Sequence, residues 1–126
     1  MRLSRMLAPT KRLFSTPDVI SDVAIEMLAL TPADTLYDLG AGDGTFLIRA
    51  AQASGCRCVG VEIDGPRAEL ARGLVAEAKL EHLITIHTGN ALAVDISDAT
   101  KIYLYLVPRG YRALLPMLRA LPTPVR

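Results

Sequence analysis

The fold is decided at residues 35–51, "TLYDLGAGDGTFLIRAA", where Gly40, Gly42 and Gly44 stand at alternate positions between a strand-like run and a helix-like run. Glycine is favoured where the backbone turns sharply or lies close to another group. The stretch is therefore either a tight turn or a loop against which a ligand lies. The elements around it distinguish the two interpretations.

Strand-like and helix-like runs alternate along the chain. Apolar spacing predicts strands at residues 35–39, 56–63, 83–87 and 101–107, and helices at 17–30, 45–54, 66–79 and 109–121. This alternation indicates an α/β fold with a doubly wound parallel sheet, whose ligands lie beyond the carboxyl ends of the strands. The glycine stretch follows the first strand at such an end, which favours a ligand loop.

Helical spacing also predicts which faces are buried. The first helix should bury Val19, Ile20, Val23, Met27 and Leu28, and the second Phe46, Leu47, Ala50 and Ala51. Cys56 and Cys58 share one face of a strand, where two thiols without further sulfur or imidazole partners are expected to be buried core groups. No metal site is predicted.

The composition excludes several classes of protein. The chain has 126 residues, 51% hydrophobic residues and a net charge of +1, which predict one globular domain with no general attraction to nucleic acid or anionic membranes. No apolar run approaches the roughly 18 residues of a membrane span.

The N-terminal segment differs in charge from the rest. Before Asp18 it carries Arg2, Arg5, Lys11 and Arg12 and no acid. This composition fits a mitochondrial presequence or a basic arm at residues 1–13, followed by one domain at 14–126. Cytoplasmic and mitochondrial locations both stay open.

The glycine spacing fits the dinucleotide fingerprint G-x-G-x-x-G poorly, because Thr45 occupies the third-glycine position. Residues 38–44, DLGAGDG, resemble instead the D-x-G-x-G-x-G motif of class I methyltransferases that use S-adenosylmethionine. The resemblance implies a Rossmann-like fold, with the loop backbone under the amino-acid part of the cofactor. It also places Asp38 near the cofactor's positive charge or as a brace of the loop.

Glu62 ends the second predicted strand, in "VGVEID", 22 positions after Gly40. A carboxylate there can accept hydrogen bonds from both ribose hydroxyls, and Ile63 can pack on adenine. The alternative is a solvated carboxylate at a strand end. Asp64 is predicted to cap the helix that follows.

Gly89 and Asn90 follow the third strand, where the class I family has a Gly-Asp or Gly-Asn pair that meets adenine. The Asn90 amide offers a donor and an acceptor for an adenine edge. An Asn-Gly-type turn is the competing interpretation.

A narrower resemblance concerns the substrate. Residues 14–28, "FSTPDVISDVAIEML", and 95–108, "DISDATKIYLYLVP", are similar to small lysine methyltransferases, a family that includes the enzyme modifying the c subunit of mitochondrial ATP synthase. This implies methyl transfer to a protein lysine, with a protein partner rather than nucleic acid and no stable membrane insertion. Thr16 and Pro17 would then lie over the methionine end of the cofactor.

Catalytic candidates come from the fourth strand. Tyr103 and Tyr105 would share one face and line an apolar channel that favours the unprotonated amine, or else pack under a helix. No general base is predicted, because Asp43 is expected to brace the loop, and Asp95 and Asp98 to lie in solvated turns.

Three alternatives remain open at this stage. The chain could act on RNA or a small molecule, bind a nicotinamide nucleotide, or be a catalytically silent adenosine-binding module.

The open sheet of the class I methyltransferase superfamily, which the chain resembles, usually has seven strands. Only four strands are predicted from this sequence. The chain is therefore expected to be a fragment truncated after the fourth strand and its following helix.

Overall fold

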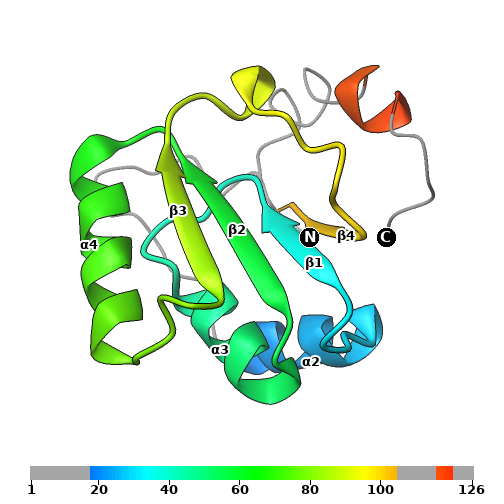
Figure 1. Cartoon of the computed structure of the whole chain (residues 1–126), viewed down its shortest axis with the longest axis vertical. Helices are drawn as coiled ribbons and strands as arrows, with labels where there is room; N and C mark the ends of the chain where they lie inside the picture. The colour runs from blue at the N-terminus through cyan, green and yellow to red at the C-terminus, as the bar shows by residue number, and fades with distance from the viewer. Residues whose placement is uncertain (1–17, 105–115, 121–126) are drawn as a thin grey trace.

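Within the described residues, four parallel strands form one sheet (Figure 1). The computed structural model describes residues 18–104 and 116–120. In chain order its elements are α2 (Asp18–Leu28), β1 (Thr35–Asp38), α3 (Thr45–Ser54), β2 (Arg57–Glu62), α4 (Gly65–Glu77), β3 (Ile84–Thr88), the 3-10 turn η1 (Ala91–Ala93) and β4 (Lys101–Tyr103). The strand order is β3-β2-β1-β4, so the direction of winding reverses at β1. The predicted Rossmann-like parallel fold is confirmed.

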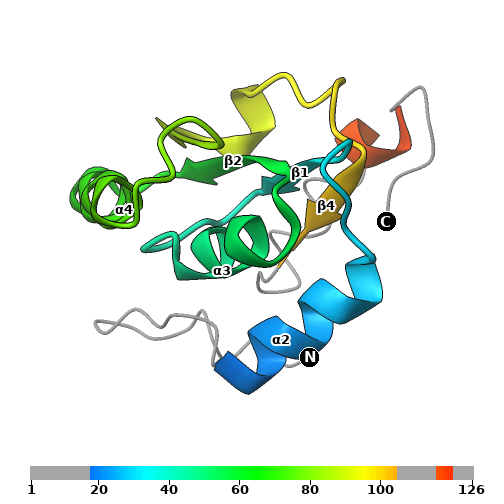
Figure 2. The same ribbon diagram turned by 60° about the horizontal axis from the view of Figure 1, so that its bottom comes forward.

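The two faces of the sheet carry separate apolar cores, and Figure 2 shows helices α2 and α3 on one of these faces. Helices α2, α3 and α4 cover one face, where Leu36, Leu47 and Ile86 belong to one cluster. On the other face, Tyr37, Val59 and Val61 pack with residues 96, 99, 117 and 118. Neighbouring residues of a strand enter different cores because side chains alternate across a strand.

The ends of the helices follow the local sequence. Gly55 has a φ of +74° and its N–H donates to the Ala51 carbonyl, which ends α3 where predicted. The Asp64 carboxylate accepts the Arg67 N–H at 3.0 Å and caps α4, as expected. The predicted strand 101–107 is described only as far as Tyr103, and of the helix 109–121 only residues 116–119 are described as helical.

The predicted buried face of α2 is wrong in four of its five positions. Val19 and Met27 are each 73% exposed, and Ile20 and Val23 are exposed as well; of the predicted set only Leu28 is buried. The packed side is formed instead by Ser21, Ala24, Ile25 and Leu28. Ion pairs of Arg49 on α3 with Asp18 and Asp22 hold α2 in this rotation about its axis.

The Cys56 and Cys58 thiols are buried on one face of the chain, as predicted. Their sulfur atoms lie 3.8 Å apart and both are free. They belong to the core cluster that also contains Leu36 and Ile84.

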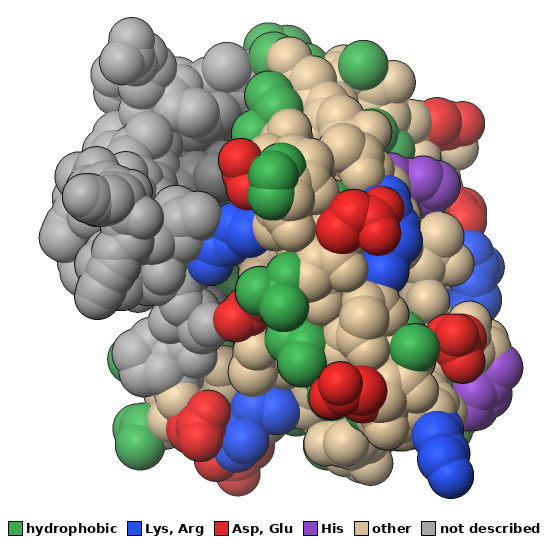
Figure 3. Space-filling model, turned by 90° about the vertical axis from the view of Figure 1, so that its left-hand side faces the viewer, with side chains coloured by type: hydrophobic (Ala, Val, Ile, Leu, Met, Phe, Trp, Pro, Cys, Tyr) green, Lys and Arg blue, Asp and Glu red, His purple; other side chains and the backbone are tan. Residues whose placement is uncertain are grey.

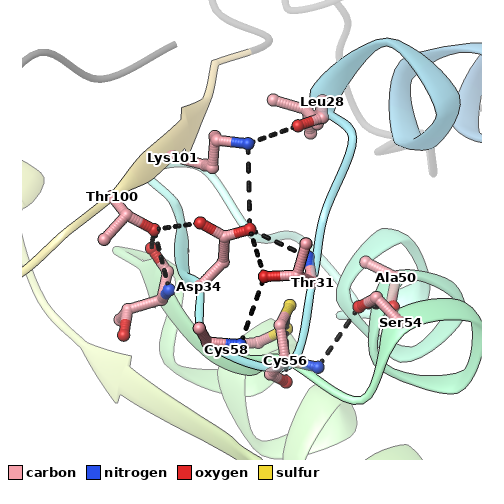
Figure 4. Close-up of polar contacts among 11 residues, drawn as sticks. Leu28, Thr31, Asp34, Ala50, Ser54, Cys56, Cys58, Thr100 and Lys101 are labelled. Carbon is pink, nitrogen blue, oxygen red and sulfur yellow. Dashed lines mark hydrogen bonds and ion pairs between the residues drawn. The ribbon is translucent and has the colours of Figure 1, made fainter.

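A partly buried polar network joins the amino ends of β1 and β4 (Figure 4). The Thr100 hydroxyl accepts the Thr35 N–H at 2.9 Å and donates to Asp34 Oδ1 at 2.8 Å. Lys101 Nζ donates to the Leu28 carbonyl and lies 3.8 Å from Asp34 Oδ2. The same carboxylate oxygen accepts the Thr31 N–H, so one aspartate ties the turn after α2 to both strands.

Candidate functional site

The loop between β1 and α3 crosses the carboxyl ends of the two neighbouring strands. Its Ala41 N–H donates to the Val61 carbonyl of β2 at 3.0 Å, and the Leu39 N–H to the Tyr103 carbonyl of β4 at 3.4 Å. The loop therefore lies where the winding direction reverses, the position at which open α/β sheets bind ligands.

Gly42 contacts residues of two other elements, β2 and α4. Its φ is +59°, and its N–H donates to Glu62 Oε1 at 2.7 Å. A Cβ at this position would lie 3.4 Å from the Arg67 guanidinium of α4. The backbone here is thus enclosed between a carboxylate on β2 and a cation on α4, and only glycine adopts this φ without strain.

Gly44 serves packing as well as turning. Its φ is +82°, and a Cβ would lie 3.1 Å from the Ala71 Cβ of α4. Beside it the Asp43 carboxylate accepts hydrogen bonds from the Thr45 N–H and hydroxyl. The prediction that Asp43 braces the loop is confirmed by these two bonds.

Gly60 is a site residue that sequence reasoning missed. A Cβ there would lie 2.8 Å from Ala41 Cβ, 2.8 Å from Leu47 Cδ1 and 2.9 Å from Ile86 Cδ1. The missing side chain lets the glycine loop and α3 lie directly on β2. Its position between two valines of the predicted strand, in "CVGVE", was the available signal.

Asp38 is a buried carboxylate at the carboxyl end of β1, only 2% exposed. Its pKa is raised to about 7, mainly by burial and also by the nearby negative charges of Glu62 and Asp43, while the hydrogen bond from the Gly40 N–H lowers it in part. The Gly40 N–H lies 3.2 Å from Asp38 Oδ1. A cation bound beside this carboxylate would relieve both burial and repulsion.

Glu62 has a local role that was not predicted. Besides Gly42, it accepts the Asp64 N–H at 3.0 Å through Oε2, so each carboxylate oxygen holds one backbone N–H. An ionised carboxylate has about four acceptor positions, and each oxygen retains capacity for a hydroxyl. The side chain is part of the loop's support, in contrast to the alternative of a solvated strand end.

The two predicted adenine contacts, Ile63 and Asn90, follow the neighbouring strands β2 and β3, where the Gly89 N–H donates to the Glu62 carbonyl at 2.9 Å. Ile63 is 70% exposed, and Leu92, which was not predicted, is 49% exposed in η1. Asn90 Oδ1 accepts the Leu92 N–H at 2.8 Å and caps η1. Asn90 thus caps η1 from an extended backbone conformation, with a φ of −88°, which differs from an Asn-Gly-type turn. Its side-chain amide nitrogen forms no hydrogen bond within the described residues, and its contact with adenine stays a prediction.

Of the remaining predicted site residues, only Tyr103 lies within the described part of the chain. Thr16, Pro17 and Tyr105 lie outside the described residues. Tyr103 is half-buried and stacks on Phe46 of α3, with ring centroids 3.9 Å apart and an interplanar angle of 17°. The packing alternative is therefore observed for Tyr103, and a contact with substrate stays a prediction.

The sequence did not predict a role for Arg67 at the loop, although Asp64 and Pro66 predicted where its helix begins. Its place three positions after the cap directs it over Gly42. The loop thus has three carboxylates near it, on Asp38, Asp43 and Glu62, and one guanidinium. This balance suits a ligand that carries positive charge and hydroxyl groups.

The surface over α4 mixes both signs of charge. In Figure 3 acidic and basic side chains are interspersed on this face and hydrophobic groups are scattered between them. Within residues 18–104 and 116–120, no three or more His, Cys, Asp or Glu side chains are arranged so that they could hold a metal ion. In that same part of the chain, no helix has both the length and the apolar character needed to span a bilayer.

Comparison with known proteins places this geometry in context. The family described as ANTKMT methyltransferase domain matches residues 38–124. A protein-lysine N-methyltransferase from Saccharolobus islandicus is 33% identical over 104 residues, which make up 82% of this chain and 65% of that protein. The chain thus spans just under two thirds of that relative's length.

Solved structures agree with the fold. An RNA methyltransferase from Salinibacter ruber in complex with S-adenosyl-L-homocysteine is 40% identical, with a TM-score of 0.81, and the match covers 83% of this chain and 69% of that one. A precorrin-6y C5,15-methyltransferase from Geobacter metallireducens is 20% identical, with a TM-score of 0.67 and coverage of 77% and 52%. At that identity the second likeness supports the fold alone.

Proposed function

Since the chain belongs to the ANTKMT methyltransferase domain family, a class I family whose methyl donor is S-adenosylmethionine, we propose that it transfers a methyl group to a lysine side chain of a protein. The observation that carries the proposal is the Gly42 N–H held by Glu62 beside the buried Asp38 carboxylate. This arrangement offers acceptors to hydroxyls and to a cation at one loop. The identity of 33% with a protein-lysine N-methyltransferase supports lysine as the acceptor.

The residues present fit this cofactor. In the proposal Asp38 faces its ammonium group, because a buried carboxylate with a raised pKa gains most from a neighbouring cation. Glu62 uses its remaining lone pairs for the ribose hydroxyls while it keeps Gly42 in place. Gly40, Gly42 and Gly44 let the backbone lie against the ligand.

The adenine end is assigned to the residues that follow β2 and β3. We place Ile63 on the face of the base, because its exposed apolar side chain would be covered there. The amide nitrogen of Asn90 is assigned to the base edge, since its oxygen already caps η1. Thr16, which lies outside the described residues, is assigned to the methionine end of the cofactor.

The acceptor must lose its proton before it reacts. When bound, S-adenosylmethionine supplies a methyl group on a positively charged sulfur, which an unprotonated amine takes up while the sulfur leaves as a neutral thioether. We assign Tyr103 and Tyr105 to the lining that excludes water and disfavours the ammonium form. The surplus proton of the lysine passes to solvent, since no general base is proposed.

RNA is the second candidate acceptor. The Salinibacter ruber protein, 40% identical to this chain, is described as an RNA methyltransferase. A net charge of +1 offers little general attraction to a polyanion, which favours the protein substrate.

The test is incubation with methyl-labelled cofactor and a cell extract, with halves treated by ribonuclease or by protease before separation. Label that survives ribonuclease, disappears with protease and yields methyllysine on hydrolysis supports the proposal. Label that ribonuclease removes would identify RNA as the methyl acceptor. Gly42→Ala should abolish labelling, whereas Gly73→Ala, at a glycine with nothing within 4 Å of its added Cβ, should not.

A further inference from the structure

Helix α2 presents an apolar row to solvent. Val19, Val23 and Met27 are spaced four residues apart along the helix, and Ile20 lies next to the row; their exposed fractions range from 45% to 73%. Surface helices normally turn such a row toward the core. Here the opposite side of the helix packs inward, through Ser21, Ala24, Ile25 and Leu28.

An acidic row runs directly beside it. Asp18, Asp22 and Glu26 repeat at the same spacing and are all exposed. Arg49 pairs with the first two, and Glu26 has no side-chain partner within the described residues. A groove of about 500 Å³ between α2 and α3 is lined by Asp22, Ile25, Glu26, Arg49, Gln52 and Ala53.

We propose that this α2 face, defined by Val19, Ile20, Val23 and Met27 with the acids Asp18, Asp22 and Glu26, recruits the protein substrate through a segment that is both basic and apolar. The inference rests on the proposed function, since it names the partner of that activity. Charge complementarity selects the occupant: apolar side chains cover the row while lysine or arginine side chains meet the acids and enter the groove.

The same charges disfavour other occupants. A second copy docked on its own α2 face by a two-fold axis would bring like acidic rows together. A membrane surface with anionic lipids would be repelled by the three carboxylates, because such surfaces attract Lys and Arg.

The direct test uses a fluorescein-labelled helical peptide of leucine and lysine, roughly four turns long, and a counterpart with glutamate in place of lysine. Fluorescence anisotropy at low salt should show that the lysine peptide binds the wild-type chain and the glutamate peptide does not. The double variant Val23→Glu/Met27→Glu should weaken binding by about tenfold or more, and Glu26→Lys by about threefold to tenfold. Leu70→Glu, which changes an exposed apolar residue on α4, is the matched control and should bind like wild type.

Equal binding of the two peptides, or equal loss in Leu70→Glu, would overturn the inference. So would concentration-dependent self-association, or binding to phosphatidylserine vesicles, that Val23→Glu/Met27→Glu abolishes, since either identifies a different occupant. In the methyl-transfer assay the double variant should label extract proteins more weakly while its affinity for S-adenosylhomocysteine stays unchanged. If the wild type labels no protein yet still binds the lysine peptide through α2, the proposed function fails and the docking surface stands.

Discussion

At the scale of a single residue, the buried Asp38 carboxylate of the candidate site lowers the stability of the ligand-free fold. The folded chain buries this carboxylate beside two others and raises its pKa to about 7, so ionising it above that pH costs folding free energy. The unfolded chain ionises it near pH 4. The fold therefore holds a charge that a cationic ligand would stabilise.

Asp38→Asn should separate the two effects. The amide keeps an oxygen for the Gly40 N–H and removes the buried charge, so the free energy of unfolding of the ligand-free protein should rise by roughly 2–4 kcal/mol at pH 8. Affinity for S-adenosylhomocysteine should fall by roughly 10-fold to 100-fold through loss of the charged contact. Urea unfolding and calorimetry measure the two quantities; a variant that binds as tightly as wild type would remove Asp38 from the ligand site.

Glu62→Ala should weaken the site in two ways. The Gly42 and Asp64 N–H groups lose their acceptor, and the ribose hydroxyls lose theirs, so binding of S-adenosylhomocysteine should weaken by roughly 1–3 kcal/mol. Glu77→Ala, near the end of α4, is a control for removal of an acid. Unchanged affinity in Glu62→Ala would make its contact with Gly42 purely structural.

Single residues were predictable where their partners are local. Asp43 and Asp64 act on groups two and three positions away, and turn chemistry identifies such contacts. The bond from Gly42 to Glu62 joins residues 20 positions apart, and only the register of β2 against the loop brings them together. The place of Glu62 at a strand end predicted it as a site residue. Its contact with the Gly42 N–H was not predicted.

At the scale of elements, close packing of the loop on β2 depends on Gly60. Gly60→Ala should destabilise the protein by roughly 1–3 kcal/mol, because the new methyl group would lie under 3 Å from Ala41, Leu47 and Ile86. Gly73→Ala on α4 meets nothing and should instead stabilise by up to about 1 kcal/mol. Thermal unfolding of both variants gives the comparison, and equal stabilities would contradict the packing account.

The rotation of α2 marks the limit of periodicity as a guide. Residues 19, 20, 23, 27 and 28 fit one helical face, and so do 21, 24, 25 and 28, which share Leu28. Hydrophobicity favours the first set, but the smaller Ser21 and Ala24 and the ion pairs of Arg49 decide for the second. Helix propensity and spacing located the element and left its orientation to tertiary contacts.

At the scale of the whole molecule, the alternation of strand-like and helix-like segments was sufficient to predict a parallel sheet with a candidate site at the carboxyl ends of its strands. Each βα unit carries local signals, such as Gly55 after α3 and Asp64 before α4, and right-handed crossovers restrict the topology. The link between β1 and β4 was less visible. It depends on Asp34 and Thr100, 66 positions apart, whose side chains meet only in the folded sheet.

The half-buried Asp34 carboxylate and the buried Asp38 carboxylate should shape the pH dependence of the whole fold in opposite ways. Burial raises the pKa of Asp34, but the Thr100 and Thr31 hydrogen bonds and the Lys101 charge outweigh this and leave it below its ordinary value. The stability that Asp34 contributes is thus present above pH 4 and lost as pH falls through its folded pKa. Asp38 has the opposite sign: the folded state binds its proton more tightly, so stability falls as pH rises from about 4 to about 7.

The ligand-free protein should therefore be most stable near pH 4–5, as measured by urea unfolding at a series of pH values. Asp38→Asn should remove the decline toward pH 7 and leave the acid side intact, whereas Asp34→Asn should weaken the fold most above pH 4, where the ionised carboxylate holds Lys101 and Thr100. Saturating S-adenosylhomocysteine should also reduce the decline in the wild type, because we propose that its ammonium group pairs with ionised Asp38. A decline that persists in Asp38→Asn would assign it to other groups and remove the physical reason for placing a cation at the end of β1.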